Sequence, residues 1–276
     1  MSMLQALASR GPDSAGVALY DAKPANELVL RISVGTNGAA KTIRARAAEW
    51  GQVNSSSTQS EYMRLSLNFD GDPSALETEV EKCGYEIEVV SMGHSLEIVK
   101  QVGSPQNLDS DYAVSAFKGT HGIGHTRMST ESAIDLSHSQ PFWAHGCPDL
   151  AIVHNGHITN YHKMRRIYEQ RGVRFYTEND SEIIGIYLGE RLQAGTSLEE
   201  ALQESIDDLD GSFSYLAATP TAMGFARDRF ALKPLLFTET EEFVAVATEE
   251  IALRSTFHSE FSVGEARAKE VRVWER

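Results

Sequence analysis

Cysteine is scarce in this 276-residue sequence, which has Cys83 and Cys147 and no others. Two cysteines exclude a disulfide framework, and their spacing is not that of metal ligands, so we expect plain thiols and a cytoplasmic location. Basic residues are also few: 25 Lys and Arg stand against 39 Asp and Glu, giving a net charge of −14. Nucleic acids and anionic membranes would repel such a chain, which argues against both as partners.

Long apolar runs are absent too. The longest notably uncharged stretch, Gly211 to Ala226, is interrupted by Ser, Thr, Gly and Pro, and it predicts a strand, a turn and a strand instead of a bilayer span. The first residues lack the basic start and apolar run of a secretory signal, so no export is expected. With 41% hydrophobic and 23% charged residues, the composition is that of a soluble globular protein.

Hydrophobic periodicity predicts strands that mostly follow one another closely, which favours antiparallel sheets. The expected strands are 14–20, 27–34, 62–69, 85–92, 95–102, 119–127, 150–156, 213–219, 223–227, 234–237 and 243–248. The expected helices are the tail 4–9 and the segments 39–50, 73–84, 161–170, 181–193 and 197–209, the last with a Ser197–Glu200 capping box. Residues 53–60 are expected to be a flexible connection. We predict one α+β domain over 1–276, with 21–118 an elaboration that carries no motif.

Five ordered motifs carry the chemistry of this sequence. They are RGPDSAG from Arg10, GHTRMST from Gly124, HNGHITNY from His154, TENDSE from Thr177 and RDRFALKPL from Arg227. Together they resemble the glutaminase domain of class II glutamine amidotransferases, over residues 10–20 and about 119–253. The resemblance implies an N-terminal-nucleophile hydrolase fold, a four-layer αββα sandwich of two mainly antiparallel sheets, with L-glutamine as substrate and no cofactor.

The resemblance also assigns the substrate-binding residues. Arg127 matches the arginine that holds the glutamine α-carboxylate, a task that suits the two-pronged guanidinium; a structural ion pair is the alternative. Ser129 and Thr130 follow it as further substrate contacts, and Met128 stands where the family has an aromatic residue. Asp180 matches the carboxylate that receives the α-ammonium. Its alternative role is an N-cap for the helix that follows, and the two roles are compatible.

Asn155 and Gly156 match the oxyanion hole, in which the Asn amide and the Gly backbone N–H face the developing negative charge. Asn-Gly is also a common hairpin turn, so a purely structural role is the alternative. RGPDSAG is expected to pack closely beneath the site. In RDRFALKPL, Ala231 replaces the glycine that is usual in the family, so a backbone conformation with positive φ is in question at this position. The expected role of this motif is packing.

Seven of the nine histidines lie between His121 and His162, so a metal site has to be weighed. Alternation along the strands would point His side chains to opposite faces, and we predict no metal. Cys147 has no free amine beside it and is expected to be an unreactive loop thiol.

Relatives begin with a strand whose terminal Cys attacks the glutamine amide, and this sequence has Ser2 instead. Ser2 is a conceivable nucleophile, yet it lies too close to Arg10 to match the family spacing. The sequence therefore resembles the family domain without its first strand. Three explanations compete: a start codon assigned too far downstream, a truncation, or a loss of catalysis. The misassigned start is favoured. The expected function is a glutaminase subunit that supplies ammonia to a separate synthase partner of the glutamate-synthase type. The alternative is a non-catalytic glutamine-binding subunit.

Overall fold

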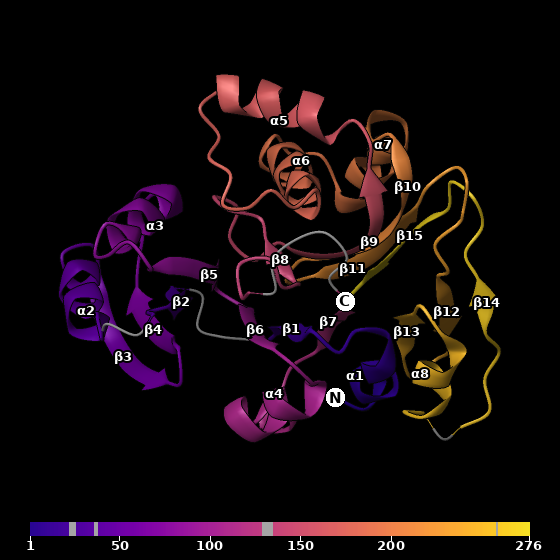
Figure 1. The fold of residues 1–276 in the computed structure, drawn as a ribbon, viewed down its shortest axis with the longest axis horizontal. Helices are drawn as coiled ribbons and strands as arrows, with labels where there is room; N and C mark the ends of the chain where they lie inside the picture. The colour runs from indigo at the N-terminus through magenta and orange to yellow at the C-terminus, as the bar shows by residue number, and fades with distance from the viewer. Residues whose placement is uncertain (22–25, 36–37, 129–134, 258) are drawn as a thin grey trace.

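Two antiparallel sheets stacked on each other form the centre of the computed structural model, which describes residues 1–21, 26–35, 38–128, 135–257 and 259–276 (Figure 1). The first has the order β6-β1-β7, from β6 (Leu96–Val102), β1 (Ser14–Tyr20) and β7 (His121–Arg127). The second has the order β15-β11-β10-β9-β8, from β15 (Val271–Glu275), β11 (Ala222–Arg227), β10 (Gly211–Ala218), β9 (Ala151–Ile158) and β8 (Phe142–Trp143). Apolar side chains from both sheets, including Ile98, Ile123 and Val153, are buried in one cluster.

Helices cover the outer face of each sheet. The second sheet carries α5 (Tyr161–Gln170), α6 (Ser181–Gln193) and α7 (Leu198–Asp208), whose apolar residues join a cluster with Ile152 and Phe213. The first sheet is covered by α1 (Ser2–Ala6) and α4 (Pro105–Tyr112), with the short helices Ala8–Arg10 and Val114–Ala116 beside them. The predicted αββα sandwich is therefore confirmed, and so is the Ser197–Glu200 capping box. Among the described residues, no helix has the length and apolar character needed to cross a membrane.

Residues 27–93 form a separate four-stranded sheet at one side of the sandwich (Figure 1). Its order is β3-β4-β2-β5, from β3 (Gln52–Gln59), β4 (Tyr62–Asn68), β2 (Glu27–Ser33) and β5 (Glu88–Gly93), with α2 (Ala40–Ala48) and α3 (Pro73–Glu81) packed beside it. The predicted flexible connection at 53–60 was wrong, because these residues are the edge strand β3. Its polar side chains are exposed, so its backbone pairing with β4 is what makes it a strand.

A fourth sheet, at the opposite side of the sandwich, has the order β13-β12-β14. Its strands are β12 (Leu236–Glu239), β13 (Val244–Ala247) and β14 (Gly264–Glu265), and α8 (Glu250–Arg254) packs on β13 and α1. Within the described ranges, β7 and β13 each pair along one edge, since both are the outer strands of their sheets. Both strands line the cavity described below.

Candidate active site

A cavity of about 1480 Å³ lies between the two sheets and the start of α6. The residues that the sequence singled out come from three separate elements: Arg127 ends β7, Asn155 and Gly156 lie in β9, and Asp180 directly precedes α6. All four line this cavity. The N-terminal helix borders it as well, through Met3, Leu4 and Leu7. Ser129 and Thr130, the other predicted contacts, lie outside the described residues.

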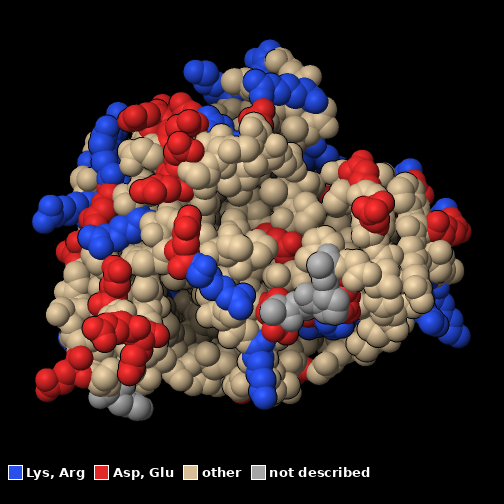
Figure 2. Space-filling view, turned by 180° about the vertical axis from the view of Figure 1, so that it is seen from behind, with Lys and Arg blue, Asp and Glu red and all other residues tan. Residues whose placement is uncertain are grey.

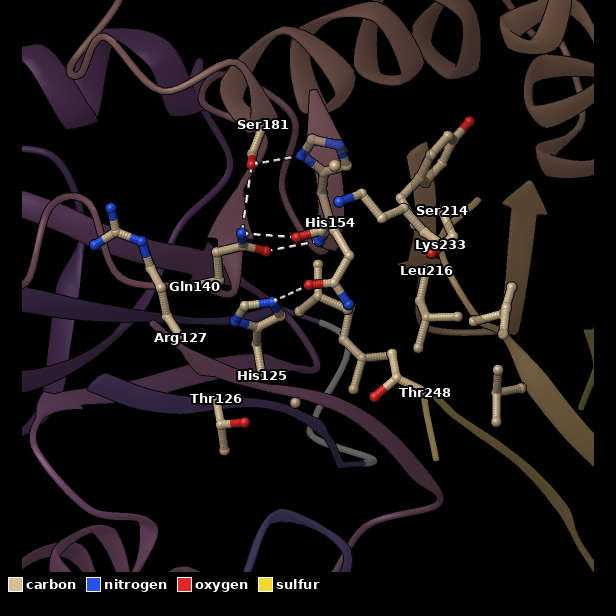
Figure 3. Close-up of a pocket in the computed structure, with 18 of the residues that line it drawn as sticks. His125, Thr126, Arg127, Gln140, His154, Ser181, Ser214, Leu216, Lys233 and Thr248 are labelled. Atoms are coloured by element: carbon tan, nitrogen blue, oxygen red, sulfur yellow. Dashed lines mark hydrogen bonds between the residues drawn. The ribbon is translucent and has the colours of Figure 1, made fainter. Parts of the chain in front are cut away.

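Arg127 brings a positive charge into the cavity wall. Its side chain is buried, and burial lowers the pKa of its guanidinium, which stays protonated all the same because the usual arginine pKa is so high. His125 lies two positions earlier in β7 and therefore on the same face, whereas Thr126 points the other way (Figure 3). Met128, 55% exposed, is at the cavity edge. The end of β7 thus presents one cation and one imidazole to the cavity.

Asn155 is held by His125, whose Nε2 lies 3.2 Å from its Oδ1 (Figure 3). Burial lowers the pKa of His125 to about 4, so the ring is neutral near pH 7 and its Nε2–H donates to this oxygen. With its oxygen engaged, the Asn155 amide has its NH₂ free to donate. Gly156 has φ +126°, and a Cβ there would lie 2.0 Å from the backbone oxygen of Ser212. Glycine is therefore required next to Asn155 for a steric reason.

His154, Gln140 and Ser181 form a buried network behind Asn155 that sequence reasoning missed (Figure 3). The Gln140 amide receives a hydrogen bond from His154 N at 2.6 Å and donates to His154 O at 3.0 Å. Ser181 Oγ lies 3.0 Å from His154 Nδ1. The side-chain amide of Gln140 thus pairs with the backbone of His154 in β9, as the backbone of a neighbouring strand would. The segment SHSQPF was visible in the sequence, but nothing in it indicated that its glutamine pairs with β9.

Asp180 is fixed to β9 instead of capping α6. Its Oδ2 accepts a hydrogen bond from Ile158 N at 2.7 Å, and its Oδ1 lies 3.7 Å from His154 Nδ1. The carboxylate makes no capping hydrogen bond, and Asn179 Oδ1 accepts from Ser181 N at 2.9 Å. One carboxylate oxygen is therefore anchored at the cavity wall, and the side chain keeps 19% of its surface exposed there.

Neither thiol belongs to this site, because Cys83 and Cys147 are absent from the cavity lining. Burial raises the pKa of the Cys147 thiol to about 11, so it is not activated as a nucleophile. In the described part of the chain, no three His, Cys, Asp or Glu side chains are grouped so that they could hold a metal ion. Near the cavity, His125 instead bonds to Asn155 and His154 to Ser181, while His157 Nδ1 lies 3.9 Å from Asp180 Oδ2.

Comparison with known proteins identifies the class of this protein. The glutamine amidotransferase domain family matches residues 125–255. A putative glutamine amidotransferase of Methanothermobacter thermautotrophicus is 38% identical over 283 residues, which cover 99% of this chain and 92% of the relative. The glutamine amidotransferase-like protein GlxB of Rhizobium meliloti is 33% identical over 254 residues, 91% of this chain and 83% of that protein.

The fold leads to the same class. The glutamine phosphoribosylpyrophosphate amidotransferase of B. subtilis superposes with a TM-score of 0.63 at 19% identity, over 99% of this chain and 43% of that one. This chain thus spans less than half of that solved protein. The chain belongs to the glutamine amidotransferase family, and its fold is that of the class II, N-terminal-nucleophile type.

Proposed function

We propose that this chain binds L-glutamine in the cavity and acts as a glutaminase subunit that supplies ammonia to a separate synthase. The observation that carries the proposal is the convergence of Arg127, Asp180, Asn155 and Gly156 on one cavity. A free amino acid has one carboxylate and one ammonium, and the guanidinium and carboxylate complement them. The side-chain amide of glutamine would then lie toward Asn155, whose NH₂ is left free by His125.

In the proposed reaction, a terminal cysteine like that of relatives gives its thiol proton to its own α-amine, and the thiolate attacks the amide carbon. The C–N bond then breaks, the α-amine passes the proton to the departing nitrogen, and ammonia leaves while a thioester remains. Water then cleaves the thioester to glutamate and regenerates the thiol. The Asn155 NH₂ and the Gly156 N–H would donate to the oxyanion at both steps. The thiol would be carried by a strand lying in the cavity between the free edges of β7 and β13, since consecutive residues 122–128 and 244–248 line it from both sides.

Calorimetric titration with L-glutamine tests the proposal, with ammonia release measured on the same samples. We expect Arg127→Ala to weaken glutamine binding about 30-fold or more, because it leaves the substrate carboxylate unpaired. Arg165→Ala is the matched control: this arginine also lines the cavity, where it donates to Glu169 and to Thr177 O. Equal binding by the wild-type and Arg127→Ala chains would contradict the proposal.

The second candidate is a glutamine-binding subunit without turnover. It is favoured by one observation, that no cysteine of the described chain lines the cavity. Glutamine binding that depends on Arg127, with no ammonia released by the full-length natural protein in the presence of its synthase, would select this candidate.

A further inference from the structure

The segment 227–233 is a rigid turn beside the cavity. Asp228 Oδ1 accepts hydrogen bonds from the backbone N–H groups of Phe230, at 2.6 Å, and Ala231, at 3.2 Å. Arg227 donates from Nη2 to Ala231 O at 2.7 Å. Ala231 has φ +53°, so the alanine adopts the left-handed conformation that the family's glycine would suit, at a cost of about 1 kcal/mol. The hydrogen bonds of two buried charged residues therefore hold a strained backbone in place.

This turn exposes two large apolar side chains. Phe230 is 56% exposed and Leu232 is 72% exposed, on either side of the strained alanine. The Arg229 guanidinium lies 5.1 Å from the centre of the Phe230 ring, within the range of a cation–π contact. Packing, the role expected for this motif, applies to Arg227 and Asp228 but not to the two apolar residues. Single exposed apolar residues are ordinary, whereas exposed apolar residues that lie together with polar groups around them mark contact surfaces.

The surroundings of the turn are basic in an acidic protein. Segments 157–166 and 227–235 contain six Lys and Arg residues and one acidic residue, Asp228. Arg227 and Asp228 are buried, which leaves five basic residues with exposed surface. The two segments are joined through Asp210, which pairs with Arg229 at 3.3 Å and donates its N–H to Asn160 Oδ1 at 3.0 Å. Figure 2 shows Lys and Arg side chains at the top of the molecule, where α5 lies in Figure 1, with Asp and Glu side chains close to them.

Residues of the same two segments line the cavity. Lys233 follows the turn and lines the cavity wall, and so do Tyr161 and His162 at the start of α5 (Figure 3 shows Lys233). A molecule that covers the turn would therefore lie next to the cavity. Phe230 and Leu232 do not line the cavity themselves, but Lys233, which does, directly follows Leu232 in the chain.

We propose that Phe230 and Leu232 are the anchors of a docking surface for a partner protein that presents an apolar pocket bordered by carboxylates. The two apolar side chains would fill the apolar pocket, and the basic groups near them would pair with its carboxylates. A second copy is disfavoured, since a symmetric contact here would bring two basic surfaces together. A membrane or nucleic acid would extend beyond the basic segments and meet the rest of a chain of net charge −14. That the partner is the ammonia-using synthase rests on the proposed function; the docking itself does not.

The test compares the tagged full-length chain with the double variant Phe230→Ser, Leu232→Ser. A protein that the wild-type chain retains in its native host is identified, produced separately, and its Kd measured with both chains. We expect the double variant to bind it at least about 30-fold more weakly, because both anchors are lost. Ile251→Ser is the matched control, since Ile251 is 54% exposed on α8, and it should leave the Kd within about twofold.

Equal Kd values for the wild-type and double-variant chains would overturn the proposal, and so would retention of the same proteins, or of none, by both chains. A wild-type dimer in light scattering that the double variant abolishes would show that the occupant is a second copy. Binding to phosphatidylserine vesicles that the double variant abolishes would show that it is a membrane. Glutamine titration of the same variants separates this inference from the proposed function. The double variant should bind glutamine like the wild type; a chain that docks its partner but binds no glutamine contradicts the proposed function alone.

Discussion

His125 and His154 are the residues whose ionisation state the cavity fixes most strongly. Burial is the main cause that lowers the pKa of each to about 4, from a usual value of 6.5. Both rings are therefore neutral near pH 7, which allows His125 to donate one hydrogen bond to Asn155 while its other nitrogen carries no proton. A charged ring at either position would add a second cation beside Arg127 and change the electrostatics of the cavity.

We expect acid to destabilise the protein through these two histidines. Because their folded-state pKa values are depressed, the unfolded chain binds more protons between pH 6.5 and about 4, so stability is lost as pH falls through that window. Between pH 7 and pH 5 the loss should be about 2 kcal/mol per histidine. Urea unfolding of His154→Asn at both pH values should show a smaller loss than the wild type, whereas His162→Asn, at an exposed position, should not. An identical pH dependence in all three chains would contradict this assignment.

At the scale of elements, a buried ion cluster attaches the sheet of residues 27–93 to the sandwich. Glu97 of β6 is 3% exposed and accepts from Arg31 of β2, through Nε at 2.9 Å, and from Arg64 of β4, through Nη2 at 2.9 Å. This contact is notable because both arginines belong to one sheet and the glutamate to another. The cluster therefore sets how the outlying sheet is seated against β6.

Glu97→Gln should destabilise the fold by about 2–3 kcal/mol, because it leaves two partly buried guanidinium groups without their carboxylate; their partial exposure keeps the cost below that of a fully buried pair. Chemical denaturation measures the loss. Glu49→Gln is the control, since its pair with Arg46 is largely solvent-exposed and should contribute under about 0.5 kcal/mol. Equal effects of the two substitutions would show that the cluster does not anchor the sheet.

At the scale of the whole molecule, Tyr20 connects the two sheets of the sandwich. Its hydroxyl lies at the end of β1 and donates to Ala218 O, at 2.6 Å, at the end of β10; Asp149 O lies 3.1 Å away. The ring is fully buried and stacks on His121, with centroids 4.5 Å apart. The hydroxyl thus satisfies carbonyl groups that water does not reach.

Tyr20→Phe keeps the ring and removes this contact, so we expect a loss of about 1–3 kcal/mol from the unsatisfied carbonyl groups. Thermal unfolding followed by circular dichroism should remain one transition at a lower Tm. Tyr85→Phe, at a fully exposed position, should leave Tm unchanged. A Tm for Tyr20→Phe equal to that of the wild type would mean that water replaces the hydroxyl.

Much of the fold was predictable from local signals. Hydrophobic alternation located β1, β2 and β4, and capping and helical spacing located α6 and α7, because those signals come from neighbouring residues. The strand β3 was not predictable, since its polar sequence has no strand pattern and its pairing with β4 decides its conformation. The helix α4 and the strand β15 were also missed; β15 becomes a strand by pairing with β11.

The candidate site divides in the same way. The sequence by itself singled out Arg127, Asn155, Gly156 and Asp180 through the resemblance of its ordered motifs to those of the family, because each motif is a run of neighbouring residues. Tertiary structure alone decided that they line one cavity, that Gln140 and His125 hold β9 from other segments, and that Phe230 and Leu232 face outward. The physical reason is that burial, hydrogen-bond partners and pKa depend on contacts between residues far apart in the chain, and no local pattern encodes those distances.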